Sequence, residues 1–288
     1  MNVARDAHQL GPARRAAAIG SFDGVHRGHR RVLEAAIASG LRPAVVTFDP
    51  HPRSVLGKGV ELLTTTDRKL ELLAEAGIED VLLLRFDEHL KALSPEAFAA
   101  DVLRAAGIDC VAAGDAFRFG LDRAGDVALL ERLGFDVRRV PLVESVSSSH
   151  VRHLLRTGDV ASAAHVLGRP HEVEGIVVHG EGRGRQLGFP TANLDVPEGL
   201  LVPPDGVYAG AALGRRAAIS IGTNPQFGGV ERHVEAHLLD FDDDLYDQRL
   251  IVQVWEPLRG QLVFGSVDEL VEQIASDVER TRSTEAPA

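Results

Sequence analysis

The chain has 288 residues, of which 44% are hydrophobic and 25% charged, a composition typical of a globular protein with one large domain or two of usual size. Its 42 acidic and 31 basic side chains give a net charge of -11, which argues against binding to nucleic acid because no basic cluster compensates for it. Cys110 is the single cysteine, so we expect no disulfide within the chain, no thiolate metal site and a cytosolic location, without a signal peptide or a membrane span.

The first half of the chain predicts alternating helices and strands. Four helix-like segments end on a glycine, which favours the left-handed conformation at a helix C-terminus; these are Gly40, Gly77, Gly107 and Gly134. Short apolar runs predict strands of a parallel sheet buried on both faces; they cover residues 16–19, 44–48, 81–84, 110–113 and 137–140. The expected fold is an open α/β sheet with helices on both faces, and its ligand would lie beyond the carboxyl ends of the strands.

The second half predicts an antiparallel β-barrel. A helix expected over residues 151–167 ends at Gly168-Arg169-Pro170, so we place the domains at residues 1–168 and 169–288. The apolar runs that follow have no helices between them; they cover residues 173–178, 207–213, 217–221, 234–239 and 250–255. Ser266 followed by Glu269 predicts the capped start of a C-terminal helix that packs on the barrel.

A glycine-rich segment with two histidines follows the first predicted strand, in the sequence SFDGVHRGH (residues 21–29), and leads into a helix. Gly24 and Gly28 would let the backbone approach a phosphate at this helix start, and His26 and His29 can donate hydrogen bonds to a transferred phosphoryl or nucleotidyl group. In one alternative the glycines only form the turn and the histidines cap the helix. In another, the two histidines join Asp23, Asp49 and His51 in a metal-dependent phosphoesterase site.

The FDGVHRGH segment resembles the HxGH-type turn of nucleotidyltransferases, and the chain is similar to bacterial bifunctional riboflavin kinase/FAD synthetases. Further segments occur in the order of that family: TFDPHP, LTTTDRKLELL, LSPEAF, GDAFRFG and VSSSHVR. The resemblance implies a Rossmann-like N-terminal domain that transfers an adenylyl group from ATP to FMN, giving FAD and pyrophosphate. Within GDAFRFG, it implies that Phe117 and Phe119 bind the flavin, whereas Ala116 departs from the Asn or Asp that is common in the family.

The same resemblance implies roles for two groups of phosphate-binding residues. His26 and His29 would contact the ATP phosphates, while Ser147, Ser148 and Arg152 would form a second phosphate-binding loop. Serine hydroxyls at a helix start can donate to an anion, and an arginine fork matches phosphate oxygens. From the residues alone, these serines are equally well explained as helix caps.

A second glycine-rich segment, GEGRGRQLGFPTAN, covers residues 180–193. No βα unit follows it, which argues against a dinucleotide-binding fold. The segment predicts a glycine-rich flap whose backbone donors, at Gly182 and Gly184, face phosphates together with Arg183 and Arg185. The alternative is a solvent-exposed loop between strands.

The segments PTAN and VEAHLLDF resemble the corresponding segments of riboflavin kinases. The resemblance implies that Thr191 holds Mg²⁺, that Asn193 lies beside the nucleotide phosphates, that Phe189 contacts the flavin and that Glu235 is the catalytic carboxylate. By pattern alone, Glu235 is equally a solvated strand residue. Gln226 stands where the family commonly has threonine, and the acidic run at residues 240–244 indicates a hairpin turn rather than a calcium loop.

The resulting hypothesis is a bifunctional enzyme that uses ATP and Mg²⁺ to convert riboflavin to FMN and then FMN to FAD. One alternative, motivated by Ala116, is a riboflavin kinase whose adenylyltransferase domain is degenerate or has another substrate. Another is a flavin- or nucleotide-binding regulator without turnover. The expected partners are riboflavin, FMN and ATP, with no nucleic acid and no membrane, and the sequence leaves a homo-oligomer open.

Overall fold

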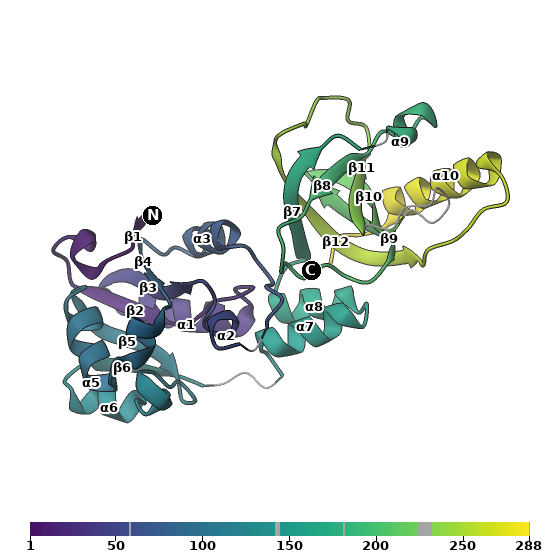
Figure 1. The fold of residues 1–288 in the computed structure, drawn as a ribbon. Helices are drawn as coiled ribbons and strands as arrows, with labels where there is room; N and C mark the ends of the chain where they lie inside the picture. The colour runs from purple at the N-terminus through teal and green to yellow at the C-terminus, as the bar shows by residue number, and fades with distance from the viewer. Residues whose placement is uncertain (58, 142–144, 181, 224–231, 288) are drawn as a thin grey trace. The chain divides into compact units, whose positions relative to one another are not determined.

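The computed structural model describes residues 1–57, 59–141, 145–180, 182–223 and 232–287. Contacts divide the chain into two compact units (Figure 1), of which the first contains Met1–Val60 and Thr66–Val146 and the second Glu61–Thr65 and Ser147–Ala288. The functional domains expected at residues 1–168 and 169–288 stay a prediction, because a compact unit does not by itself mark where an activity resides.

The first unit contains a six-stranded, all-parallel sheet in the order β1-β4-β3-β2-β5-β6. Its strands are β1 (Asn2–Ala4), β2 (Arg15–Ile19), β3 (Arg42–Asp49), β4 (Asp80–Arg85), β5 (Ile108–Gly114) and β6 (Asp136–Val140). All five predicted strands are confirmed. The sequence pattern missed β1, because this strand has only three residues and lies at the edge of the sheet.

Helices connect these strands and cover both faces of the sheet. They are α1 (Arg27–Ile37), α2 (Pro52–Val55), α3 (Thr66–Glu75), α4 (Glu88–Ala92), α5 (Pro95–Ala97), a π-helical turn (Phe98–Arg104), α6 (Val127–Arg132) and two 3₁₀ turns (Ala7–Leu10 and Leu121–Arg123). The glycines predicted to end helices all have φ between 67° and 90°, as the left-handed C-cap requires.

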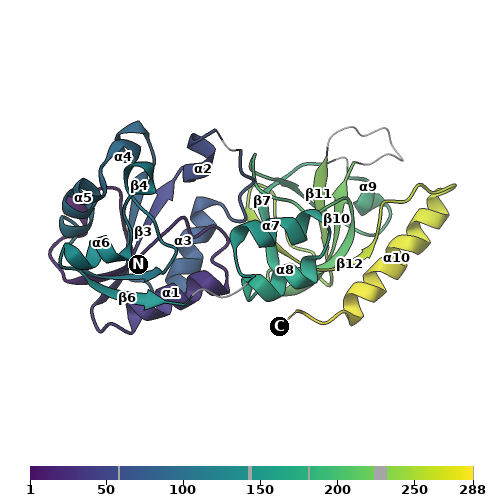
Figure 2. The same cartoon turned by 90° about the horizontal axis from the view of Figure 1, so that it is seen from below.

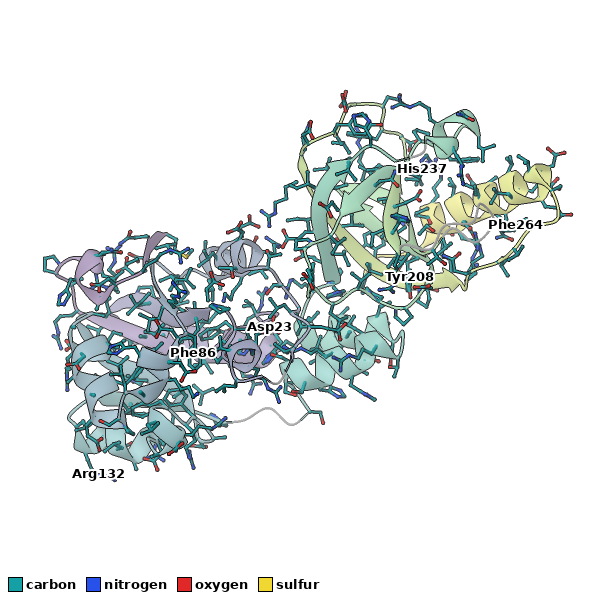
Figure 3. The ribbon with its side chains drawn as sticks, in the orientation of Figure 1. Asp23, Phe86, Arg132, Tyr208, His237 and Phe264 are labelled. Carbon is teal, nitrogen blue, oxygen red and sulfur yellow. The ribbon has the colours of Figure 1, made fainter. Side chains whose placement is uncertain are left out.

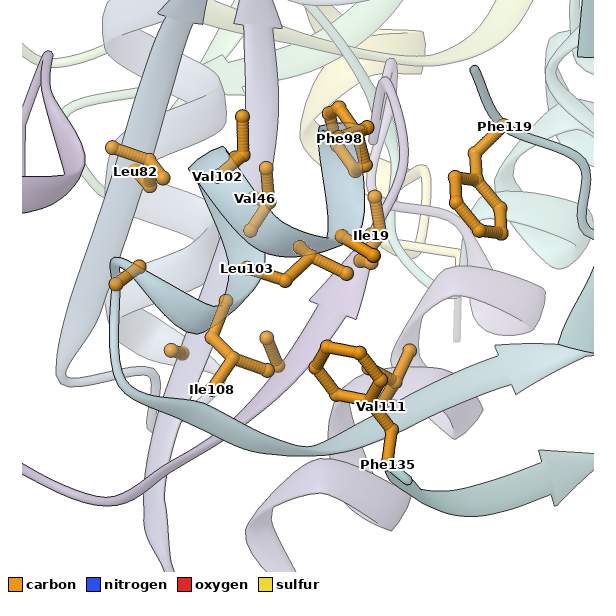
Figure 4. Packing of buried hydrophobic residues seen from close by; sticks show 14 of the residues in the cluster. Ile19, Val46, Leu82, Phe98, Val102, Leu103, Ile108, Val111, Phe119 and Phe135 are labelled. Atoms are coloured by element: carbon orange, nitrogen blue, oxygen red, sulfur yellow. The ribbon is translucent and has the colours of Figure 1, made fainter. Parts of the chain in front are cut away.

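The core of the first unit consists of two apolar layers, one on each face of the sheet. On one face, the π-helical turn and α6 pack on alternating residues of β2, β3 and β5, including Ile19, Val46 and Val111 (Figure 4). On the other face, α1 and α3 contribute Leu33 and Leu72. The continuous burial of β2 explains why its sequence has no polar residue after Arg15.

The second unit contains a closed six-stranded barrel in the order β10-β11-β8-β7-β12-β9, with every pair antiparallel. Its strands are β7 (His171–Val178), β8 (Ala192–Asp195), β9 (Gly206–Ala212), β10 (Arg215–Gly222), β11 (His233–Leu238) and β12 (Arg249–Arg259). Its helices are α7 (Ser148–Arg156), α8 (Val160–Leu167), α9 (Arg183–Gln186) and α10 (Val267–Ser283). The predicted barrel and C-terminal helix are confirmed. None of the helices among the described residues combines the length and apolar character of a membrane span.

Two predictions about the second unit are wrong in detail. The single helix expected over residues 151–167 is two helices, because Gly158 adopts a φ of 81° and Asp159 caps α8 by accepting from the N–H of Ser162. The acidic run at residues 240–244 does not form a hairpin. It links β11 to β12, and these strands are not neighbours in the barrel.

Helix α10 begins as the sequence predicts and packs against β9 and β10 (Figures 1 and 2). The hydroxyl of Ser266 accepts from the N–H of Glu269, and the Glu269 carboxylate accepts from the N–H of Gly265 at 2.9 Å. Farther along, the buried Asp277 carboxylate accepts from Arg259 Nε on β12 at 2.8 Å. This buried ion pair ties the helix to the end of β12.

His171, at the start of β7, makes the stability of the second unit depend on pH. Burial lowers the pKa of His171 to about 4 from an ordinary 6.5, although the hydrogen bond of Nε2 to Leu201 O at 3.0 Å acts in the opposite direction. The unfolded chain therefore takes up a proton below pH 6.5 that the folded unit refuses. This contribution to the free energy of unfolding is fully present above pH 6.5, and we expect about 3 kcal/mol of it to be lost as the pH falls to 4.

Urea unfolding between pH 7.5 and pH 4 measures this effect through the fluorescence of Trp255, the single tryptophan, which lies in β12. In His171→Gln the amide can still donate to Leu201 O but does not titrate. The variant should lose less stability on acidification than the parent chain. Equal losses in the two proteins would contradict the assignment to His171.

Candidate active sites on the two units

The turn between β2 and α1 in the first unit is tightly folded and buried. Gly24 has a φ of 81°, and two residues with side chains also have positive φ, Phe22 at 50° and Val25 at 39°. Phe22 and Val25 are buried in the apolar layer beneath α1, which holds them in this unfavourable conformation. Such backbone strain is concentrated at functional sites, so this turn is a candidate site on structural grounds alone.

The two predicted catalytic histidines lie together in this turn. His26 caps α1, and its Nδ1 accepts from the N–H of His29 at 3.2 Å. The two imidazole rings stack with centroids 3.6 Å apart and an angle of 13° between their planes. A Cβ on Gly28 would lie 3.2 Å from the His26 ring, so the glycine allows this close approach. The structure thus brings His26, His29, Gly24 and Gly28 together at one helix start.

The turn between β2 and α1 that contains His26 and His29, called the histidine turn below, can accept an anion. Burial, and secondly the proximity of His26, lowers the pKa of His29 well below its ordinary value, so His29 is a neutral hydrogen-bonding group at pH 7. Two buried nitrogens in the first turn of α1, His29 Nδ1 and Arg30 Nε, have no hydrogen-bond partner among the described residues. Buried polar atoms are rarely left unsatisfied, and a phosphate at this helix N-terminus would supply acceptors.

The GDAFRFG segment follows β5, the strand beside β2. The chain runs from β2 toward β3 and β4 in one direction and from β5 toward β6 in the other, so β2 and β5 flank the topological switch point where ligands bind in open α/β sheets. Phe117 and Phe119 stack with ring centroids 5.5 Å apart, and Phe119 is buried against Phe98 in the core. The flavin contacts expected of Phe117 and Phe119 stay a prediction.

The expected second phosphate loop belongs to the second unit, at the start of α7. The hydroxyl of Ser147 accepts from the N–H of His150 at 3.2 Å and caps the helix, and Ser148 is the first helical residue. Arg152 is buried and donates through Nε to Glu61 O at 2.7 Å. The capping role is thus present in the structure, while the phosphate-binding role of these residues stays a prediction.

Two further charged residues of the first unit, Asp23 and Lys69, are buried. The sequence pattern offers no reason to assign Lys69, and it places Asp23 only in the alternative metal-dependent site. Asp23, labelled in Figure 3, is buried in the histidine turn. Lys69 on α3 is also buried and donates to Phe48 O at the end of β3 at 3.0 Å. Burial lowers the pKa of Lys69, while the Asp49 and Asp23 carboxylates act in the opposite direction. Only the folded sheet brings these charges to the same edge.

In the barrel, strand register aligns three polar side chains. Glu235 on β11 lies directly opposite Asn193 on β8 and Ser220 on β10. Directly paired residues of antiparallel strands share a face, so these three side chains lie side by side on one surface of the barrel. The buried residues Val234, Ala236 and Leu238 alternate with Glu235 and point to the other face.

The flap brings Thr191 to Glu235. The Thr191 hydroxyl donates to Glu235 Oε2 at 3.2 Å. Two glycines make room for this arrangement, since a Cβ on Gly180 would lie 2.5 Å from the Asn193 side chain and one on Gly184 would lie 2.4 Å from Phe189 O. The structure therefore unites Thr191, Asn193 and Glu235, which are separated by up to 44 residues in the sequence.

A pocket of about 560 Å³ lies over this polar surface. Its lining includes the predicted Gly182, Arg183, Gly184, Phe189, Thr191, Asn193 and Glu235. Apolar walls come from Leu187 on the flap and from Leu270 and Ile274 on α10. The size falls in the range of small-molecule sites, and the mixture of apolar walls with a few convergent polar groups is typical of them.

Seven other polar residues of the pocket were not assigned from the sequence: His179, Ser220, His233, His237, Arg259, Gln261 and Asp277. Strand alternation places His237 on the face of Glu235, and this signal was visible in the sequence. Ser220 needed the register of β10, and the Arg259–Asp277 pair needed the packing of α10 on the barrel. Gln226, the predicted departure from the family, lies outside the described residues.

The pocket contains hard oxygen donors that suit Mg²⁺. The Thr191 hydroxyl, the Glu235 carboxylate and the Asn193 amide supply them. Among the described residues, no group of three or more His, Cys, Asp or Glu side chains could hold a metal ion by itself. Mg²⁺ at a nucleotide commonly has only one or two protein ligands, because the phosphates complete its coordination.

Comparisons with known proteins match both halves of the chain. A family model for FAD synthetase matches residues 9–152, and one for riboflavin kinase matches residues 167–284. The bifunctional riboflavin kinase/FMN adenylyltransferase of Escherichia coli (strain K12) is 37% identical over 300 residues, covering 96% of each chain. The protein of that name from Pseudomonas fluorescens is 37% identical over 316 residues, covering 100% of this chain and 99% of its own.

A solved structure also matches nearly the whole chain. It is named a macrolide-efflux protein from Streptococcus pneumoniae and has a TM-score of 0.87 and 30% identity, covering 98% of this chain and 99% of that chain. Together the two domain models span both units, and each of the two curated relatives matches both units by itself. The chain therefore belongs to the family of bifunctional riboflavin kinase/FMN adenylyltransferases.

Proposed function

We propose that this chain phosphorylates riboflavin to FMN and then adenylylates FMN to FAD, using ATP in both reactions. The observation that carries the kinase half is the contact between Thr191 and Glu235 beneath the flap, with Asn193 directly opposite Glu235. The histidine turn at the switch point of the parallel sheet supports the adenylyltransferase half.

In the kinase reaction, Glu235 accepts the proton of the ribityl hydroxyl group. The hydroxyl oxygen then forms a bond to the γ-phosphorus of ATP, the bond to the β,γ-bridging oxygen breaks, and ADP leaves. Arg183 and the flap backbone would stabilise the transferred phosphoryl group. Thr191, with Asn193 nearby, would hold Mg²⁺, which when bound neutralises charge between the phosphates.

In the adenylyltransferase reaction, a phosphate oxygen of FMN attacks the α-phosphorus of ATP and pyrophosphate leaves. The attacking oxygen is already ionised at pH 7, so no general base is required. The neutral His29 and its stacked neighbour His26 would donate hydrogen bonds to the charge that develops on the phosphates. The buried Arg30 Nε, which has no hydrogen-bond partner in the described part of the chain, would contribute another donor from the same helix turn.

Cys110, the single cysteine, supports a cytosolic location for both reactions. The thiol is buried, and burial raises its pKa to about 11, with the Asp136 carboxylate acting in the same direction. It therefore stays a protonated, unreactive thiol and needs no oxidising compartment.

The direct test incubates the purified full chain with riboflavin, ATP and Mg²⁺ and separates the flavins by chromatography over time. We expect FMN to appear first and FAD to follow, and omission of Mg²⁺ should prevent FMN formation. FMN that never becomes FAD would contradict the adenylyltransferase half and point to Ala116. Unchanged riboflavin would contradict the kinase half; if added FMN also stays unchanged while flavin binding is measurable, both halves are contradicted and a binding protein is favoured.

A further inference from the structure

His237 lies on β11 two residues after Glu235 and lines the same pocket (Figure 3). Its Nδ1 lies 2.8 Å from Pro190 O, and because a carbonyl oxygen can only accept, Nδ1 must carry the proton. The imidazole and the Phe189 ring also meet edge to face, with centroids 5.6 Å apart and planes at 81°. His237 thus contacts two consecutive residues of the flap.

The segment that His237 contacts leads directly to the candidate magnesium ligand. Pro190 has no N–H, so its carbonyl oxygen is its only backbone group for a hydrogen bond. The next residue, Thr191, donates to Glu235. Glu235 and His237 lie on the same face of one strand, about 7 Å apart along it, and therefore hold adjacent flap residues.

The other end of this segment is fixed by the first turn of the flap. The N–H of Phe189 donates to Gly184 O at 2.8 Å, and the absence of a side chain on Gly184 allows Phe189 O to approach. Residues 189–191 are thus held from α9 on one side and from β11 on the other. Pro190 and Thr191 share a planar peptide bond. A displacement of Pro190 would therefore move the Thr191 hydroxyl relative to the Glu235 carboxylate.

We propose that His237 is a positioning residue of the kinase site, which places the Thr191 hydroxyl for Mg²⁺ by holding Pro190 O and the Phe189 ring. This inference rests on the proposed kinase function. It assigns His237 no proton transfer and no direct role in the transfer of the phosphoryl group. Groups that orient a metal ligand typically change metal affinity by about 10–100-fold when they are removed, and this sets the size of the expected effect.

The test compares His237→Ala with His237→Asn in the full chain. The amide N–H of asparagine lies close to the position of imidazole Nδ1–H and can donate to Pro190 O, whereas alanine cannot. In His237→Ala we expect the Mg²⁺ concentration for half-maximal FMN formation to rise about 10–100-fold, and His237→Asn should recover most of this loss. Adenylylation of added FMN should stay unchanged in both variants.

A binding measurement separates this inference from the proposed function. Calorimetry with ADP, in the presence and absence of Mg²⁺, does not require turnover. His237→Ala should weaken binding of Mg²⁺-ADP but not of ADP alone, and His237→Asn should bind Mg²⁺-ADP nearly as the parent chain does. A parent chain that binds Mg²⁺-ADP but makes no FMN would contradict the proposed kinase reaction, while the two variants would still test the role of His237.

The control variant is His165→Ala, which removes an exposed histidine of α8 in the same unit, outside the pocket. It should leave Mg²⁺ dependence and Mg²⁺-ADP binding unchanged. The positioning role is wrong if His237→Ala keeps the Mg²⁺ dependence of the parent chain. It is also wrong if His237→Asn requires as much Mg²⁺ as His237→Ala does. The same holds if His237→Ala weakens the binding of ADP alone as much as the binding of Mg²⁺-ADP.

Discussion

Replacing Glu235 with glutamine is expected to lower the rate of FMN formation by about 10²–10⁴-fold, the usual contribution of a general base. The glutamine amide has nearly the same size and can still accept from the Thr191 hydroxyl, so the flap contact is preserved while the proton acceptor is lost. Initial rates with saturating riboflavin, ATP and Mg²⁺ measure the effect. The rate of FAD formation from added FMN serves as an internal standard on the same chain.

The matched control for this substitution is Glu256→Gln, at an exposed position of β12 outside the pocket. It changes the net charge by the same amount and should leave FMN formation unchanged. Near-normal FMN formation by Glu235→Gln would show that the carboxylate is not the base. A parallel loss of both activities would instead indicate a defect of folding.

Substitution of His26 or His29 should slow the adenylyltransferase reaction and leave the kinase reaction intact. We expect His29→Gln and His26→Asn each to slow FAD formation from FMN by about 10²–10³-fold, the effect of losing a donor that acts on developing charge. Asparagine at position 26 can still cap α1, which separates the chemical role of His26 from its structural one. Chromatography of flavins measures the rate, and FMN formation from riboflavin should be unaffected.

His8→Asn is the control for the histidine pair, because His8 is an exposed histidine of the first unit outside the turn. FAD formation should be normal in this variant. If FAD formation also survives in His29→Gln and in His26→Asn, the pair only builds the turn, as the capping interpretation holds. Thermal unfolding of each variant checks that the first unit remains folded.

The fold was largely predictable because both of its periodic signals are local. Apolar runs separated by glycine-terminated helices predicted the parallel sheet, and runs without helices between them predicted the barrel. The missed elements are short. β1 has three residues and β8 has four, too few for a pattern to emerge, and their pairing with β4 in the sheet and with β7 and β11 in the barrel defines them.

The residues of the candidate sites were predictable only where they lie within one short, contiguous sequence motif. The histidine turn and the PTAN word were identified from neighbouring residues, and the structure brings their members together. Ser220 and Asp277 could not be found in this way, since they reach the pocket through strand register and helix packing. Lys69 is a similar case, because a buried lysine in an amphipathic helix has no distinguishing local pattern.

Glu235 alternates with buried residues along β11, so inserting an odd or an even number of residues into this strand has different effects. Inserting one residue just before Glu235 would turn the carboxylate into the barrel interior and expose the apolar side chains that now fill it. Inserting two residues would restore the direction of every side chain, although the pairing with Asn193 would shift. A change of odd length within β11 would thus disrupt both the packing of its buried face and the position of Glu235, whereas the segment at residues 240–244 lies between β11 and β12 and is not bound by this alternation.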